Sequence, residues 1–157
     1  SASIGNNGIY QYVNNTLTKI STTVLERYIN DLKDITDGIG QSWVEDGHLF
    51  YSITFNRANK TFVYDVTTGL WSRRESNGNK WNLSNSTQWN NLTCFGTYDG
   101  VICYLDSNKN TQYDNSPIVR KRTSGAMIND RQLFSIDELR LFIDTNRQHG
   151  KVSVRYR

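Results

Sequence analysis

The chain has 157 residues, enough for one domain with a hydrophobic core, and a net charge of +3. Its hydrophobic content of 36% includes no apolar run long enough for a membrane-spanning helix, so no membrane span is predicted. Residues 1–115 carry 9 basic and 11 acidic side chains (net −2), whereas residues 116–157 carry 9 basic and 4 acidic ones (net +5). The basic end suits nucleic acid or an acidic partner, but the spread of its charges favours an ordinary solvated surface.

Residues 8–20 are predicted to form a hairpin that turns at Asn14-Asn15, because asparagine tolerates the positive φ angles of a type I′ turn. A helix is expected at 23–32. Thr23 and Glu26 have the spacing of a capping box, in which the Thr23 hydroxyl accepts from the Glu26 amide. The helix carries one apolar stripe, which favours docking on a sheet over partner binding: Val24, Leu25, Tyr28, Ile29 and Leu32.

Residues 41–74 have the clearest β pattern of the chain. A strand ending in Tyr64-Asp65, followed by a Thr-Gly turn and Trp71, is typical of a β-propeller blade. Asp65 is expected to cap this turn rather than to act as a catalytic acid. Trp71 is expected to pack between neighbouring blades, with ligand stacking as the alternative. Two strands are each predicted to carry one apolar face, made of Leu49, Tyr51, Ile53 and Phe55 and of Phe62, Tyr64 and Val66.

Residues 75–91 are polar and rich in asparagine, and a long loop is expected there. Trp81 and Trp89 lie within it. Aromatic side chains that are exposed in such a loop often mark a contact surface, so both are candidate interaction residues. The alternative is that they fold back onto the sheet, and the sequence does not decide between the two.

Residues 92–105 predict a second hairpin, with Asp99-Gly100 at its tip. Cys94 and Cys103 flank this tip and are the only cysteines of the chain. If residue 98 pairs with residue 101, the two cysteines lie on the same face and diagonal to each other. Free buried thiols are then favoured over a disulfide.

Residues 117–122 are predicted to form an edge strand that Pro117 opens and charge blunts. Arg120, Lys121 and Arg122 supply that charge and complete the candidate interaction surface together with the two tryptophans.

Two amphipathic strands follow, at 136–144 and at 152–157. The fold class is therefore mainly all-β, with antiparallel blades of a β-propeller-like fold and one short helix near the N-terminus. Residues 1–133 are assigned to the blades, with the helix inserted, and residues 134–157 to the start of a further blade or a small β-sandwich. About three blades do not close a ring, so the chain is expected to be a piece of a longer protein.

No enzyme activity, cofactor or metal site is predicted, because the sequence has no nucleophile elbow, phosphate loop or zinc signature. Residues 106–110 begin like a calcium loop. However, Thr111 stands where that loop needs glycine, and Pro117 stands where it needs glutamate. A plain polar turn is therefore favoured.

The order of these segments resembles the tail hub proteins of short-tailed bacteriophages, also called packaged-DNA stabilisation proteins. The resemblance covers most of the chain and corresponds to the C-terminal part of longer family members. It rests on the helix at 23–32, the stretch 46–65 ending Val-Tyr-Asp, Trp71, the hairpin 93–105 with Asp-Gly and Tyr-Leu-Asp, the stretch 114–122, and the strands 136–144 and 152–157. The segment with Trp81 and Trp89 departs from the family pattern, and the chain stops before the Ser-x-Asp-Gly turn with which related proteins often continue.

The resemblance implies a structural virion protein without catalytic residues. Such a protein is expected to form a ring, six-fold in the full-length molecule, below the portal and its adaptor. It would retain the packaged DNA, connect to the tail needle and the tailspikes or fibres, and become the conduit for genome ejection. The expected location is the virion tail, assembled in the host cytoplasm, with non-specific contact to the passing DNA.

The alternative is a kelch-like β-propeller module that recognises a protein or a glycan. In that case the segment with Trp81 and Trp89 would be the recognition element. The double glycine that kelch blades carry before the tyrosine is absent here, which favours the phage protein.

Overall fold

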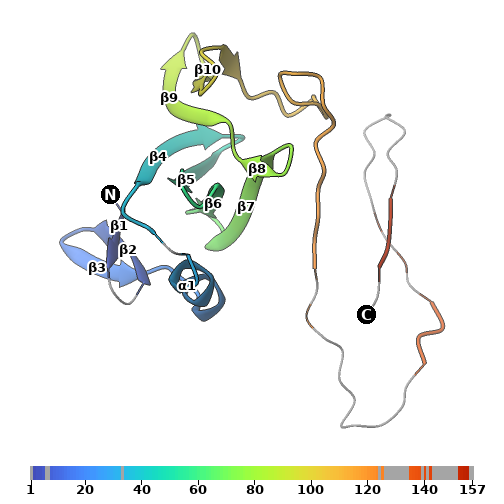
Figure 1. The fold of residues 1–157 in the computed structure, drawn as a ribbon, viewed down its shortest axis with the longest axis horizontal. Coiled ribbons are helices and arrows are strands. Elements are labelled where there is room, and N and C mark those ends of the chain that lie inside the picture. Colours follow the sequence, from blue (N-terminus) through green and yellow to red (C-terminus); the bar gives the residue numbers. More distant parts are fainter. Residues whose placement is uncertain are drawn as a thin grey trace. The chain divides into compact units, whose positions relative to one another are not determined.

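The computed structural model describes residues 2–5, 8–32, 34–123, 125, 135–138, 140, 142 and 152–155. The chain divides into two compact units, Ser1–Val119 and Arg120–Arg157, and every strand and helix of the described residues lies in the first unit. This part is mainly β, with antiparallel blade-like sheets and one short helix, which confirms the predicted fold class (Figure 1). The predicted boundary at residues 133 and 134 falls outside the described residues.

The first sheet has three strands in the order β1 (Ala2–Gly5), β2 (Gly8–Val13) and β3 (Thr16–Lys19). The predicted hairpin is confirmed, because β2 and β3 pair from Tyr10↔Lys19 to Val13↔Thr16. Asn14 and Asn15 form its turn with φ angles of 48° and 60°. Two consecutive residues with positive φ match the type I′ geometry, which follows the natural twist of the strands.

Helix α1 (Thr23–Asn30) follows the first sheet, and it is shorter than the predicted 23–32. Its N-cap is Thr22, whose hydroxyl accepts a hydrogen bond from the Leu25 amide at 3.3 Å. The predicted capping box with Thr23 is therefore wrong by one residue. The Glu26 carboxylate instead accepts from the Ser21 hydroxyl at 2.6 Å and pairs with Lys19 at 2.8 Å, so it fastens the helix to the strand before it.

The central sheet has five strands in sequence order, which are β4 (Gly38–Glu45), β5 (His48–Phe55), β6 (Lys60–Asp65), β7 (Leu70–Ser76) and β8 (Asn79–Lys80). Each strand pairs antiparallel with the next. Asp46-Gly47 and Asn77-Gly78 join two of the pairs with positive φ angles at both residues. Thr67, Thr68 and Gly69 form the turn that the sequence predicts after Asp65, and the Gly69 amide donates to the Asp65 carbonyl at 2.8 Å.

The third sheet has the order β11 (Ile102–Tyr104), β10 (Leu92–Thr97) and β9 (Leu83–Trp89). The long loop predicted at 75–91 is therefore wrong, because most of these residues lie in β7, β8 and β9. The strand β9 is built from asparagine, serine and threonine between its apolar ends, which hides the usual hydrophobic alternation. Asn90-Asn91 then makes another two-residue turn, with φ angles of 47° and 61°.

The hairpin of β10 and β11 is confirmed, but its register differs from the predicted one. Phe95 pairs with Cys103 and Cys94 with Tyr104, so the two cysteines lie on opposite faces, and both are free. The loop has three residues instead of two, because Thr97 and Val101 close it through an amide-to-carbonyl bond of 2.8 Å. Gly100 has φ 81°, which suits the three-residue loop and shifts the register by one.

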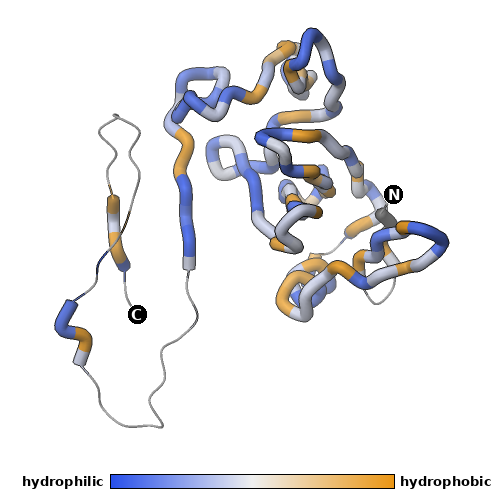
Figure 2. The backbone as a smooth tube through the Cα atoms, turned by 180° about the vertical axis from the view of Figure 1, so that it is seen from behind, coloured by the Kyte–Doolittle hydropathy of each residue, from blue (hydrophilic) through white to orange (hydrophobic). Residues whose placement is uncertain are grey.

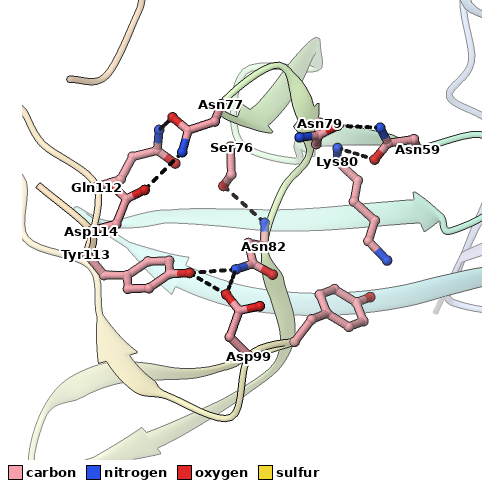
Figure 3. A pocket seen from close by; sticks show the side chains of 11 residues that line it. Asn59, Ser76, Asn77, Asn79, Lys80, Asn82, Asp99, Gln112, Tyr113 and Asp114 are labelled. Carbon is pink, nitrogen blue, oxygen red and sulfur yellow. Dashed lines mark hydrogen bonds between the residues drawn. The ribbon is translucent and has the colours of Figure 1, made fainter. Parts of the chain in front are cut away.

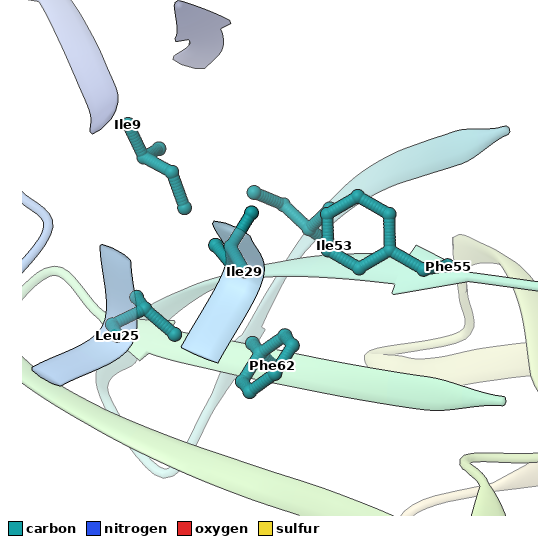
Figure 4. Packing of buried hydrophobic residues seen from close by; sticks show 6 residues of the cluster. All are labelled: Ile9, Leu25, Ile29, Ile53, Phe55 and Phe62. Atoms are coloured by element: carbon teal, nitrogen blue, oxygen red, sulfur yellow. The ribbon is translucent and has the colours of Figure 1, made fainter. Parts of the chain in front are cut away.

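Hydrophobic residues cover both faces of the central sheet. The helix-side cluster consists of Ile9, Leu25, Ile29, Ile53, Phe55 and Phe62, and Figure 4 shows the two α1 side chains facing those of β5 and β6. On the other face, Trp43, Val63, Trp81, Leu83 and Phe95 form a second group, the Trp43 cluster. Because Phe62 and Val63 are neighbours in β6, they point to opposite faces, and the middle strands are buried on both sides.

Trp71 lies between the central sheet and the N-terminal segment, and its predicted place between two neighbouring blades stays a prediction. Its ring packs against the helix-side cluster, and its indole N–H donates to the Ile20 carbonyl at 2.7 Å. Its ring centroid is 5.0 Å from that of Tyr64, its partner across the β6–β7 pair.

The predicted edge strand at 117–122 is wrong. Pro117 makes one isolated bridge with Thr111, the Ile118 amide donates to the Asn110 carbonyl at 2.9 Å, and residues 118–123 are not in a strand. A short segment does not form a strand when no neighbouring backbone continues the ladder. Of the predicted strands at 136–144 and 152–157, the structure describes residues 136–138, 140, 142 and 152–155, and none of these is in a strand.

Hydrophobic and hydrophilic positions alternate along much of the described backbone (Figure 2). In the part of the chain that the structure describes, no helix has the length and apolar character needed to cross a membrane.

Candidate interaction surfaces

Trp81 is buried, with 9% of its surface exposed, although it was predicted as an interaction residue. Its ring lies 5.3 Å from Trp43 and 5.5 Å from Phe95, measured between centroids. The Arg74 guanidinium carbon is 4.9 Å from the centroid of Trp81, and it also lies over Trp43 and Phe50. This chain's own cation therefore occupies the face that Trp81 would offer to a ligand.

Arg74 is held in this aromatic surrounding by Glu45. Its guanidinium donates to Glu45 Oε2 at 3.2 Å, and the Trp43 indole N–H donates to the same oxygen at 3.2 Å. These bonds join β4 and β7, which are not neighbours in the sheet. The group acts as a structural clamp on this face of the central sheet.

Trp89 lies at the end of β9 with 68% of its surface exposed, so the structure decides for exposure at this residue, which the sequence left open. The register of the third sheet places it opposite Leu92. Since side chains alternate along a strand, Leu92 and Cys94 share the face of Trp89, whereas Phe95 points into the Trp43 cluster.

The outward side of the third sheet carries a group of apolar side chains, here called the outer face, next to the polar Thr87 and Asn85. Cys94 is opposite Tyr104, and Ile102 follows on the same side of β11. The exposed fractions are 38% for Leu92, 54% for Tyr104 and 80% for Ile102. The residues of the outer face are Trp89, Leu92, Cys94, Ile102 and Tyr104. Within the described part of the first unit, none of them belongs to a hydrophobic cluster.

The inward side of the third sheet is fixed to the free edge of β4 by two hydroxyl groups. Ser86 donates to the Ser42 carbonyl at 3.0 Å, and Thr93 donates to the Val44 carbonyl at 2.8 Å. Edge strands expose unpaired backbone groups, and these side chains satisfy two of them. The third sheet thus stacks firmly on the central sheet and keeps its outer face turned away from it.

A second candidate site is a hollow of about 450 Å³. Three turns meet there: the Asn77-Gly78 turn, the tip of the β10–β11 hairpin and the turn at 112–115 (Figure 3). This polar hollow is lined by Asn59, Ser76, Asn77, Asn79, Lys80, Asn82, Tyr98, Asp99, Gln112, Tyr113 and Asp114. All of these side chains carry a polar group, and no aliphatic one is among them.

Hydrogen bonds between its own residues hold the polar hollow in shape. The Asn82 amide N–H₂ donates to the Tyr113 hydroxyl at 2.8 Å and to Asp99 Oδ2, and the Tyr113 hydroxyl donates to that same oxygen. On the far wall, Asn77 donates to Asp114 at 2.9 Å and accepts from Gln112 at 3.1 Å. Figure 3 shows these side chains converging from the three turns.

The charges of the polar hollow are set by these bonds. Hydrogen bonds from Tyr113 and Asn82 lower the pKa of Asp99, and Asp99 in turn raises the pKa of the Tyr113 hydroxyl. The Ser116 hydroxyl and amide, with Asn77, lower the pKa of Asp114. Both carboxyl groups are therefore anionic at neutral pH.

The Lys80 ammonium does not balance these carboxylates directly. Its nitrogen lies 3.8 Å from the centroid of the Tyr98 ring and donates to the Asn56 side chain. The cation is thus engaged on an aromatic face and an amide oxygen.

His48 and Asp65 form a pair that the sequence reasoning missed, with His48 Nδ1 at 2.8 Å from Asp65 Oδ2. Asp65 also accepts from the Thr67 amide at 2.9 Å and from the Thr68 hydroxyl at 2.7 Å, so its predicted role as a turn cap is confirmed. Burial raises the pKa of Asp65, but bonds from Thr68, His48 and the Thr67 amide outweigh it and lower that pKa to about 2. The cross-strand register of β5 and β6 brings the pair together, which spacing in the sequence does not reveal.

Arg120, Lys121 and Arg122 are exposed and belong to the second unit, whereas both tryptophans belong to the first. The three basic residues follow one another without forming a strand. Their exposure leaves them accessible to an acidic partner or to a phosphate backbone.

Among the described residues, no group of three or more His, Cys, Asp or Glu side chains has the spacing to hold a metal ion. The turn at 106–110 closes on itself, since Asp106 accepts from the Asn108 amide at 2.9 Å and from the Lys109 amide at 3.1 Å. No protein-family model matches this chain, and no curated protein matches it either.

Proposed function

We propose that this chain is a structural component of a short-tailed phage virion, a tail hub protein that docks below the portal and adaptor. The resemblance of its segment order to that family motivates the proposal, and the blade-like sheets support it. The observation that carries it is the outer face of the third sheet. A sheet with apolar residues on both sides is suited to lie between two others.

The first unit already uses such stacking internally. The central sheet packs against the third sheet through the Trp43 cluster and against α1 and β2 through the helix-side cluster. Sheets that pack face to face lie about 10 Å apart and interdigitate their side chains. The outer face offers the next layer of the same arrangement to another virion protein or to another part of the full-length protein.

The hydrophobic effect is the reason why covering the outer face with a partner should be favourable. Burying a large apolar side chain completely contributes roughly 1.5–3 kcal/mol, and the outer face holds Trp89, Leu92, Ile102 and Tyr104 within one sheet side. A contact of this kind is suited to a lasting assembly, in which the area is covered permanently. In the proposed virion, neighbours of this kind are the adaptor, the tail needle, the tailspikes or fibres and further copies in a six-fold ring.

The proposed tail hub protein has no catalytic residue. It retains packaged DNA in the tail after assembly in the host cytoplasm, and it opens the channel at genome ejection. Arg120, Lys121 and Arg122 would contact passing DNA only through phosphates, and such binding weakens strongly as salt is raised.

The test uses the full-length protein co-expressed with the products of its neighbouring genes. We expect co-purification of a portal or adaptor protein and ring-shaped particles in negative-stain images. The variant Trp89→Ser/Ile102→Ser should abolish both, because it removes the two most exposed apolar side chains of the outer face. Val24→Ser is the matched control, since Val24 is 78% exposed on α1 and Ile102 is 80% exposed on the outer face.

Two results would contradict the proposal. One is a wild-type protein that stays monomeric and binds none of these products. The other is a double variant that forms the same rings as the Val24→Ser control, which would remove the outer face from the assembly.

A further inference from the structure

We propose that the polar hollow binds a neutral saccharide. This inference does not depend on the assembly function, because the polar hollow and the outer face are formed by different residues.

The polar hollow has the size and the position of a ligand site. Its volume of about 450 Å³ falls within the roughly 300–1,000 Å³ of typical small-molecule sites. Its walls come mainly from the turns at 77–78, 98–100 and 112–115, together with Asn59 of the turn between β5 and β6 and with Lys80 and Asn82. Turns anchored on paired strands can present side chains to a ligand without losing the fold beneath them.

The hydrogen-bonding groups that remain free in the polar hollow can bind the hydroxyl groups of a sugar. Within the described part of the chain, Asn82 Oδ1 and Asp99 Oδ1 take part in no hydrogen bond, so two acceptors remain. The Asn79 amide accepts from Asn59 at 2.8 Å through its oxygen, which leaves its N–H₂ as a donor. A sugar hydroxyl donates and accepts at the same atom, and therefore matches a wall that offers both.

These groups are already oriented before a ligand arrives. Asn82, Asp99 and Tyr113 hold one another through three mutual bonds, and Asn59 accepts from the Lys80 amide at 2.8 Å. Side chains that are fixed in this way lose little conformational entropy on binding.

The charge of the polar hollow selects against anions. Asp99 and Asp114 are both anionic at neutral pH, because hydrogen bonds stabilise their charged forms. Lys80 is engaged by Tyr98 and Asn56. An anionic ligand such as a phosphate or an acidic sugar would meet net repulsion, whereas a neutral saccharide would not.

Tyr113 supplies an apolar surface at the rim. Its ring is part of a side chain that is 43% exposed, and its hydroxyl is fixed by Asn82 and Asp99. An aromatic ring of this kind provides a rigid apolar surface for the C–H face of a sugar ring.

The test is a titration of the isotope-labelled protein, followed by nuclear magnetic resonance. The probes are glucose, galactose, N-acetylglucosamine, maltotriose and triacetylchitotriose, each carried to its solubility limit, with glucuronate as the anionic comparison. We expect at least one neutral probe to shift the amide signals of Asn82, Asp99 and Tyr113, and we expect weaker binding of glucuronate.

Two variants test the assigned groups. Asp99→Asn keeps the shape but replaces a carboxylate oxygen by a donor, and Tyr113→Ala removes the ring. Each should weaken binding about fivefold or more, which is the size of one lost hydrogen bond or ring contact. Trp89→Ala is the control and should bind as the wild type does, since Trp89 lies on the outer face. The amide spectrum of each variant reports whether it is still folded.

Three results would overturn the inference. They are the absence of shifts with every neutral probe, shifts centred on Trp89 rather than on the polar hollow, and glucuronate binding as tight as that of the neutral sugars. Unchanged binding in a folded Asp99→Asn variant would also refute the assigned role of that carboxylate. None of these results bears on whether the outer face assembles.

Discussion

At the scale of single residues, Trp81 and Trp89 show how one residue type serves two purposes in one short segment. Trp81 precedes β9 and is 9% exposed within the Trp43 cluster, while Trp89 ends β9 and is 68% exposed. The difference comes from the partners that the fold supplies. Arg74, Trp43 and Phe95 surround the first ring, and the second faces outward opposite Leu92.

We therefore expect Trp81→Ala and Trp89→Ala to differ strongly in stability. Trp81→Ala should lower the free energy of unfolding by about 3–5 kcal/mol, because it leaves a cavity beside Trp43 and uncovers Arg74. Trp89→Ala should change that free energy by no more than about 0.5 kcal/mol, because its ring is exposed in the isolated chain. Urea unfolding followed by circular dichroism measures both. Similar losses for the two variants would contradict the assigned environments.

At the scale of single elements, the ends of α1 and of the β10–β11 hairpin show why boundaries depend on atomic geometry. Two adjacent threonines, Thr22 and Thr23, precede the apolar stripe of the helix, and only Thr22 has the extended φ of −90° and ψ of 155° of an N-cap. In the hairpin, Gly100 is used at the end of a three-residue loop rather than in a two-residue turn. Each case is a shift of one residue, and in the hairpin it moves every paired side chain to the other face.

The helix cap gives a test with an adjacent control. Thr22→Ala should lower the free energy of unfolding by about 1 kcal/mol, because the Leu25 amide loses its acceptor. Thr23→Ala should change it by at most about 0.5 kcal/mol, because alanine suits the helix and Thr23 makes no capping bond in the described structure. Thermal and urea unfolding of both variants give the comparison. A larger loss for Thr23→Ala would restore the capping box that the sequence suggests.

At the scale of the whole molecule, the first unit is a stack of layers around the central sheet. The layers are joined by hydrophobic clusters on both faces and by hydroxyl-to-carbonyl bonds at the β4 edge (Figure 1). Its surface adds carboxylates that several donors hold in the charged form. The free energy of unfolding of the first unit should therefore depend on pH through several carboxylates together.

Asp65 and Asp34 are the two carboxyl groups from which this pH dependence is expected. Bonds from the Thr36 hydroxyl and amide and from Arg57 lower the pKa of Asp34 to about 2, and Asp65 reaches about 2 as well. A carboxyl group with a lowered folded pKa stabilises the fold above its unfolded value of about 3.9, and this contribution is lost as the pH falls towards 2. We expect the free energy of unfolding to decrease between about pH 4 and pH 2.

The matching variant is Asp65→Asn, which keeps the size of the side chain and removes its charge. The difference in unfolding free energy between wild type and Asp65→Asn should be largest near neutral pH and should shrink below about pH 4. Urea unfolding at a series of pH values measures it. A difference that stays constant over the whole range would show that the charge of Asp65 does not stabilise the fold.

Much of the fold follows from local patterns that the sequence displays. The hairpin at Asn14-Asn15 and the turn after Asp65 appear where turn chemistry places them. The β9 strand was missed because its Asn, Ser and Thr residues are typical of loops. It forms because β10 continues its ladder and the Ser42 carbonyl of β4 accepts from the Ser86 hydroxyl. The polar hollow was missed as well, since nothing in the sequence brings Asp99, Asn82 and Tyr113 together.

The sequence by itself determined the all-β class, the docking of Leu25 and Ile29 on the sheet and the cap role of Asp65, because these depend on residues close together along the chain. The tertiary structure alone decided that Trp81 is buried beneath the Arg74 guanidinium and that Cys94 and Cys103 lie on opposite faces. It also decided that three turns meet at the polar hollow. The physical reason is that register and stacking bring distant segments into contact. A one-residue change in register moves each side chain to the other face of its sheet.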